Sequence, residues 1–124
     1  MPIRGIRGAT TANANSRDAI LTATRELLDA LVRANQLDVM DIASVYFAMT
    51  PDLDAAFPAR AAREMGWTDT ALLDAQAPRV VGDLPRCIRV LIHWNTDRAQ
   101  NEITHVYLRD ARALRPDRAR EIAQ

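Results

Sequence analysis

Apolar and polar residues alternate most regularly between Arg86 and Trp94. Every second residue of an extended chain points the same way. One side of this segment therefore carries Cys87, Arg89, Leu91 and His93, and the other carries Ile88, Val90, Ile92 and Trp94. The pattern predicts a strand over 86–94 that places an arginine among apolar neighbours.

Four further segments have the composition of strands. Residues 3–9 contain two glycines, which weaken an ordinary strand but let another backbone or a ligand approach closely. The segment 44–50 is rich in β-branched and aromatic residues, which favour a buried strand. Residues 70–76 and 103–108 are shorter candidates.

Two helices are predicted from their start and stop signals. Ser16 is a suitable N-cap for a helix whose apolar residues recur at helical spacing until Asn35, where we expect it to end. Pro58 suits the first turn of a second helix because its missing N–H costs nothing there, and Gly66 provides the stop. Residues 38–42 read as a connector into the strand that follows.

These elements, in this order, predict an α+β domain with two main helices and a mixed or antiparallel sheet. The chain has 124 residues, which suffice for one core but not for two. No repeat or composition break marks a linker. We therefore expect a single domain over 1–117 and a C-terminal tail over 118–124, whose order the sequence leaves open.

The chain contains sixteen arginines, no lysine and sixteen acidic residues, so its formal net charge is zero. Neutrality argues against nucleic acid or an acidic membrane surface as the partner, because such proteins usually carry a basic excess. Without lysine the chain can form neither a Schiff base nor a P-loop. Codon bias in a GC-rich genome is the simplest explanation for most of the imbalance.

Cys87 is the single cysteine, so no intramolecular disulfide can form. No signal-peptide pattern begins the chain, and no apolar stretch approaches the roughly 20 residues of a membrane span. We therefore expect a cytoplasmic protein that does not enter a membrane.

The usual catalytic devices do not occur in the sequence, which has no metal-ligand spacing of His or Cys and no nucleophile elbow. The unusual residues are arginines within predicted elements: Arg7, Arg60, Arg63 and Arg89. Several guanidinium groups converging on one cleft would bind a small polyanion. The alternative is that they are solvated, or that Arg89 pairs with an aspartate, because an arginine in an apolar strand must find a partner.

The segments that contain these arginines resemble the bacillus-type (AroH-type) monofunctional chorismate mutases, and the resemblance extends over nearly the full length of the chain. The matching stretches are 3–11, 48–53, 57–61 with 63–64, 66–67, 87–90, 105–108 and 114–117. Each stretch is short, but their order and near-constant spacing make the resemblance specific.

The resemblance implies a pseudo-barrel α+β fold, a homotrimer with active sites between neighbouring subunits, and the Claisen rearrangement of chorismate to prephenate without a metal or an organic cofactor. A pericyclic reaction of this kind needs no nucleophile and no proton transfer. It needs a dicarboxylate held in a reactive conformer and positive charge near the breaking ether oxygen.

The resemblance also assigns roles by position. Arg89 is expected to donate to the ether oxygen and a carboxylate in the transition state, and Arg7 and Tyr107 are expected to clamp carboxylates. The remaining expected contacts are a pocket wall from Phe57 and the backbone near Leu72 and Leu73, a charged mouth from Arg60 and Arg63 of the adjoining subunit, and a C-terminal cover from Leu114 and Arg115. Ala59 is a further expected substrate contact.

Two positions depart from the family pattern. Relatives carry Cys where this chain has Asp74 and Glu where it has Ala77, and the family Glu contacts the ring hydroxyl of the substrate. Asp74 would either replace that contact or repel the dicarboxylate. The residues thus leave open a mutase with a rearranged contact, an enzyme acting on a related enolpyruvyl or cyclohexadiene acid in secondary metabolism, and a non-catalytic binder of such a metabolite.

Overall fold

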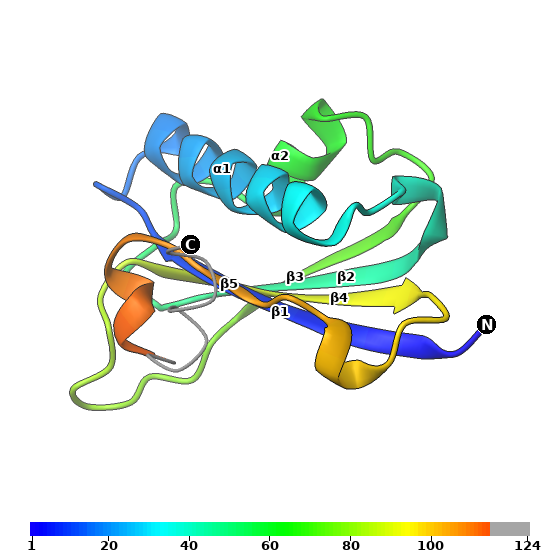
Figure 1. Cartoon of the computed structure of the whole chain (residues 1–124). Helices are drawn as coiled ribbons and strands as arrows, with labels where there is room; N and C mark the ends of the chain where they lie inside the picture. The colour runs from blue at the N-terminus through cyan, green and yellow to red at the C-terminus, as the bar shows by residue number, and fades with distance from the viewer. Residues whose placement is uncertain (115–124) are drawn as a thin grey trace.

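The computed structural model describes residues 1–114. Its centre is a five-stranded sheet with the order β3-β2-β4-β1-β5, and both α-helices lie against one face of it (Figure 1). The strands are β1 (Ile3–Thr11), β2 (Ile42–Met49), β3 (Ala71–Gln76), β4 (Cys87–Asn95) and β5 (Val106–Tyr107). The helices are α1 (Arg17–Asn35) and α2 (Ala59–Glu64), and short 3-10 turns form η1 (Val39–Asp41), η2 (Gln100–Glu102) and η3 (Arg109–Ala113). The predicted α+β class with two main helices is confirmed.

The sheet is mixed, because β4 alone runs against its neighbours. It pairs antiparallel with β1 and β2, whereas β1 pairs parallel with β5 and β2 pairs parallel with β3. The strands β1, β2, β3 and β5 therefore end at one edge of the sheet, where β4 begins at Cys87. We call this edge the Cys87 edge; it lies on the left in Figure 1.

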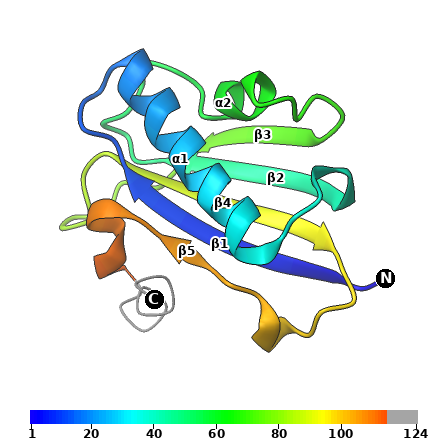
Figure 2. The same ribbon diagram turned by 45° about the horizontal axis from the view of Figure 1, so that its top comes forward.

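The core lies between the sheet and α1, which crosses the strands diagonally (Figure 2). Ile88, Val90 and Ile92 of β4 are at most 1% exposed, whereas the alternate residues from Arg89 onward are half-buried. Val90 and Ile92 pack with the leucines of α1, and Ile88 packs with Ile20 and Ala23 of the same helix. The predicted alternation of β4 is thus confirmed. We call the face of the sheet opposite α1 and α2 the open face.

The predicted limits of α1 are confirmed by its caps. The Ser16 Oγ accepts a hydrogen bond from the Ala19 N–H, and Gln36 adopts a left-handed conformation directly after Asn35. The buried Asn35 side chain donates to the Thr104 carbonyl at 2.9 Å and accepts from the Thr104 N–H at 2.8 Å. This pair of bonds ties the C-terminal end of α1 to the segment before β5.

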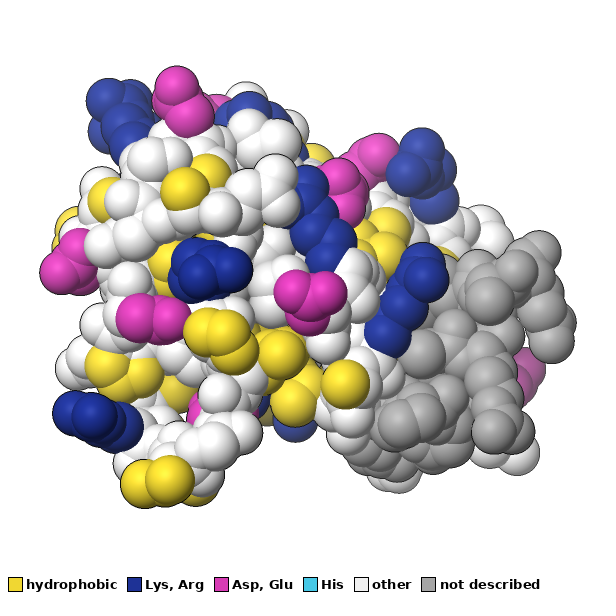
Figure 3. All heavy atoms as spheres, turned by 90° about the vertical axis from the view of Figure 1, so that its left-hand side faces the viewer, with side chains coloured by type: hydrophobic (Ala, Val, Ile, Leu, Met, Phe, Trp, Pro, Cys, Tyr) yellow, Lys and Arg dark blue, Asp and Glu magenta, His cyan; other side chains and the backbone are white. Residues whose placement is uncertain are grey.

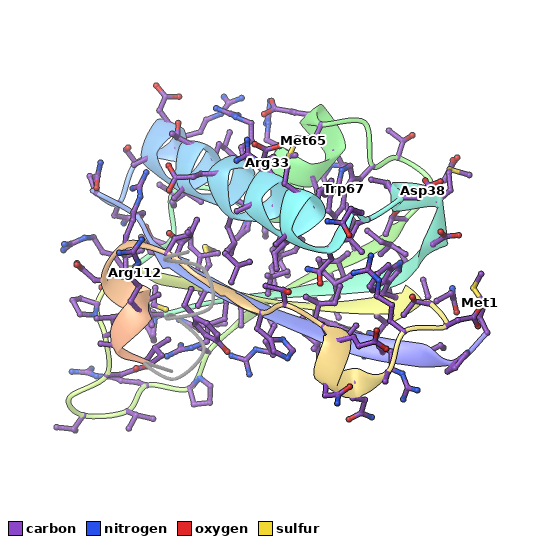
Figure 4. The ribbon with its side chains drawn as sticks, viewed as in Figure 1. Met1, Arg33, Asp38, Met65, Trp67 and Arg112 are labelled. Atoms are coloured by element: carbon purple, nitrogen blue, oxygen red, sulfur yellow. The ribbon has the colours of Figure 1, made fainter. Side chains whose placement is uncertain are left out.

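The second helix is as short as its signals predict. Pro58 precedes α2, and Gly66, with φ of 93°, follows it. Trp67 is 3% exposed, and it lies with Met65 on the helix side of the sheet (Figure 4). This packing fixes α2 against the same face as α1.

The predicted strand over 103–108 is wrong in length, since only Val106–Tyr107 pairs with β1. Side chains take the place of strand partners in front of it. Asn35 engages Thr104, and the His105 Nδ1 accepts the Arg7 N–H at 2.9 Å. The long-range polar contacts therefore replace a regular ladder.

The strand β1 passes close to α1 at Gly8. A Cβ atom at this position would lie 3.0 Å from Leu31 Cδ1, 3.1 Å from Val90 Cγ1 and 3.2 Å from Leu27 Cδ1. We expect Gly8→Ala to lower the free energy of unfolding by about 1–3 kcal/mol, because these side chains must shift in a close-packed core. Denaturant unfolding at fixed protein concentration measures this.

Gly5→Ala is the matched control, since its Cβ would make ordinary contact with Leu91 Cδ1 at 3.5 Å. It should change stability by less than about 0.5 kcal/mol. Equal losses in both variants would contradict the close approach of β1 to α1.

Candidate active site

The predicted site residues gather near the Cys87 edge, but in two groups. Arg7 and Arg89 lie on the open face, because their neighbours Ile6 and Ile88 are fully buried on the helix side. Phe57, with two arginines of α2, lines a cleft on the helix side. The single chain therefore does not bring all predicted contacts into one pocket.

The first group is set by strand register. Arg89 lies between Ala9 of β1 and Ala48 of β2, and Ala9 in turn pairs with Tyr107 of β5. The small side chains on both sides leave room for a guanidinium to extend over the open face. Arg7 lies two residues before Ala9 and so points the same way.

The arginine in the apolar strand has the partner that its position requires. Arg89 Nη2 donates to Asp83 Oδ1 at 3.0 Å, and both side chains are about one-fifth exposed, at 21% and 22%. Asp83 lies in the loop between β3 and β4. The pairing with an aspartate, which the sequence left open as the alternative to an anion-binding role, is thus present in the structure.

Tyr107 is 1% exposed and packs in a small cluster with Ala9, Cys87 and Ala111. Leu114 is partly buried against the same cluster, so this predicted residue lies beside Tyr107. Arg115 and the tail 118–124 lie outside the described residues.

Cys87 and His93 are two further titratable side chains of β4. Burial raises the pKa of the fully buried Cys87 thiol to about 11, although the charges of Arg89 and Arg7 act in the other direction. The thiol is therefore protonated at neutral pH and is no nucleophile. His93 Nδ1 lies 3.0 Å from the Ser44 Oγ. Within residues 1–114 no three His, Cys, Asp or Glu side chains could hold a metal ion.

The second group lines a cleft of about 650 Å³ beside α2. Phe57 is 67% exposed at its mouth, and Arg60 makes an exposed contact with Glu64 at 3.5 Å. Arg63 makes no ion pair with another residue in the described part of the chain. Arg17, which is not among the residues predicted from the sequence, also lines this cleft. An arginine in the first turn of a helix is unfavourable because it opposes the helix dipole. This unusual placement of Arg17 is the sequence signal that could have marked it as a candidate site residue.

Asp74 belongs to the cleft and connects β3 to α2. Its Oδ1 accepts the Ala59 N–H at 3.0 Å. Burial is the largest influence on the Asp74 carboxyl and raises its pKa, while the bond from Ala59 and the charge of Arg63 oppose it. In this chain the carboxylate thus holds the start of α2.

The side chains of the other predicted substrate contacts are distributed over both faces. The Ala59 side chain is 1% exposed and lies in the core, and Ala77 is buried with its N–H on the Met49 carbonyl. Leu72 packs against the core, whereas Leu73 is 56% exposed on the opposite side of β3.

The Cys87 edge of the molecule presents cationic and apolar groups together. Figure 3 views this end and shows arginine side chains spread among hydrophobic and acidic ones. Arg112, on η3, lies at the same end, and Met1 lies at the other (Figure 4).

An arginine-rich site without a nucleophile fits an enzyme that acts on an anionic small molecule through charge and shape. The family model "Chorismate mutase type I" matches residues 3–118. The chain belongs to this family, and it is an isomerase. None of the described helices is long and apolar enough to cross a membrane.

Individual relatives agree with the family. Chorismate mutase AroH of Thermus thermophilus is 50% identical over 116 residues, which cover 93% of this chain and 95% of that protein. Chorismate mutase AroH of Bacillus subtilis (strain 168) is 42% identical over 118 residues, covering 94% and 93%. The solved chorismate mutase from Clostridium thermocellum is 50% identical with a TM-score of 0.87, covering 88% of this chain and 97% of that one.

The raised pKa of Asp74 predicts how stability depends on pH. A carboxyl that binds its proton more tightly when folded favours the native state at low pH, and this contribution is lost as pH rises through the folded pKa. Asp74→Asn keeps an acceptor for the Ala59 N–H and removes the charge. We therefore expect the variant to gain stability relative to the parent at pH 7, and this gain to shrink toward pH 4.

Thermal unfolding of both proteins between pH 4 and 7 measures the difference. Asp29→Asn, at an exposed position of α1 in contact with Arg33, is the control for loss of one charge. A gain that stays constant over this range would contradict a burial effect on Asp74.

Proposed function

We propose that this chain converts chorismate to prephenate at sites formed between neighbouring copies of a homotrimer. The observation that carries the proposal is the division of the predicted contacts into two groups on opposite faces of the sheet, each with unpaired arginine. Arg7 and Arg63 make no ion pair with the rest of the described chain. One copy would supply the open-face group and its neighbour the cleft beside α2.

The geometry of the cleft supports a second copy as the missing wall. Asp74 and Ala75 both line it, although successive residues of a strand point to opposite faces. The cleft therefore lies against β3, which is an edge strand of the sheet. The open face of a neighbouring copy, placed against β3, would enclose the substrate.

The open face also has the composition of an interface. Ile3 and Leu73 are each 56% exposed and Tyr46 is 45% exposed. Large apolar side chains exposed on one face of a sheet favour association. Packing these faces around a common axis would give the pseudo-barrel that the family resemblance implies.

In the proposed reaction an ether C–O bond breaks and a C–C bond forms within one molecule, so no group or proton is transferred. Arg89 donates to the ether oxygen as negative charge develops there, and Arg7 and Tyr107 hold carboxylates. Arg60 and Arg63 of the neighbouring copy add positive potential. Preorganised donors act strongly at such a site because they need no rearrangement during the reaction. The cytoplasmic location expected from the sequence stays a prediction.

We expect Arg89→Ala to lower kcat by about 10²–10³-fold, as loss of a donor to a developing oxyanion does in other enzymes. Loss of chorismate absorbance measures the rate. Arg33→Ala, which removes an exposed helix arginine paired with Asp29, should leave kcat unchanged. Full activity of the Arg89→Ala protein would remove Arg89 from the mechanism, and a parent protein inert toward chorismate would refute the function.

Mixing two impaired variants tests where the site is formed. Arg89→Ala and Arg63→Ala damage different groups, so co-assembled chains should regain about one quarter of the parent sites if each site draws one group from each of two copies. The rate after joint refolding is compared with each variant refolded alone, and sedimentation gives the oligomeric state. No regain in mixed assemblies would place both groups in one chain.

A further inference from the structure

The contact between Arg89 and Asp83 is more than a surface ion pair. Its two side chains are only about one-fifth exposed, and its single hydrogen bond measures 3.0 Å. Exposed pairs contribute little because long side chains must be ordered in water to make them. Here the strand orders one partner and the loop before β4 orders the other.

The loop is built to hold the carboxylate in place. The Asp83 N–H donates to the Val80 carbonyl at 3.1 Å, and Gly82 has φ of 83°, so 80–83 form a tight turn. The next N–H, that of Leu84, donates to Asp83 Oδ1 at 2.8 Å. Leu84 itself packs against the cluster of Cys87 and Tyr107, which anchors the turn to the open face.

The Asp83 carboxylate is ionised at neutral pH. The Leu84 N–H and then the Arg89 guanidinium hold its pKa below the ordinary value for aspartate. A fixed negative charge therefore stands beside the arginine to which the proposed function gives the central role.

The contact leaves most hydrogen-bond donors of the Arg89 guanidinium unused. A guanidinium has five N–H donors, and Asp83 takes one at Nη2. Nε and Nη1 of Arg89 make no hydrogen bond with another residue among the described ones. A carboxylate standing in for the substrate would be expected to bind the guanidinium fork with both oxygens. Instead, Asp83 contacts the guanidinium with a single oxygen, Oδ1, which also accepts the Leu84 N–H.

We propose that Asp83 is a positioning residue, which holds Arg89 by Nη2 so that its other donors face the reacting ether. The proposal rests on the proposed function. It adds a residue that the family resemblance did not supply, at a site where Ala77 offers no carboxylate. Small displacements of a catalytic donor are costly, since a misplacement of about 1 Å can reduce the rate roughly 10²-fold.

We expect Asp83→Ala to lower kcat by about tenfold or more, because Arg89 then samples other orientations. The Michaelis constant for chorismate should change little or fall, since a negative charge near a dicarboxylate is removed. Asp83→Asn retains an uncharged acceptor for Leu84 and Arg89, so its kcat should lie between those of the parent protein and Asp83→Ala. Steady-state kinetics on the purified full chain separates kcat from KM, and thermal unfolding checks that each variant is folded.

Two controls identify the route of the effect. Asp29→Ala removes a carboxylate from an exposed ion pair on α1 and should leave kcat unchanged. In an Arg89→Ala background, Asp83→Ala should cause no further loss, because a residue that acts through Arg89 has nothing left to position.

Each contrary result has a distinct meaning. A lower KM with unchanged or higher kcat would overturn positioning and show that Asp83 competes with the substrate for Arg89. Additive losses in the double variant would show that Asp83 acts elsewhere. If Arg89→Ala is impaired and Asp83→Ala is not, only the inference on Asp83 fails; if Arg89→Ala retains full activity, the proposed role of Arg89 fails first.

Discussion

The period-two alternation of β4 is the constraint on which the rest of the structure depends. This strand is hydrogen-bonded on both sides, and Ile88, Val90 and Ile92 pack in two core clusters that both include residues of α1. A shift of one residue would drive the Arg89 guanidinium into that core and expose the branched side chains. Because burying an unpaired charge costs roughly several kcal/mol, the register of β4 is strongly fixed. The same register places Arg89 between two alanines on the open face.

The direction of the strands then determines where chemistry can occur. Because β4 runs against its neighbours, four strand ends and the beginning of β4 meet at the Cys87 edge. The loop that carries Asp83, the start of α1 and the segment leading to α2 all leave the sheet there. Loops that rest on a rigid sheet commonly bear functional groups. A neighbouring copy that approaches this edge would meet charged groups from both sides of the sheet.

Local signals predicted most of the fold. The cap at Ser16, the stop at Gly66 and the alternation of β4 depend on a few adjacent residues, and each is confirmed. The segment before β5 was predicted wrongly because Asn35, distant in sequence, satisfies the backbone of Thr104. Of the candidate site, Arg89 stood out locally. Its partner could not be named, since that depends on how the 80–83 turn folds back.

A neutral chain can still offer a cationic site when its carboxylates restrain some arginines and leave others unpaired. Asp83 occupies one donor of Arg89, whereas Arg7 and Arg63 make no close ion pair in the described part of the chain. An arginine is suited to this division, because its planar fork can bind a fixed carboxylate at one corner and a substrate along another edge. A lysine ammonium is a point charge and would move toward whichever anion is nearer. The composition of the chain, whatever its origin, thus favours a site in which the same residue is both held and available.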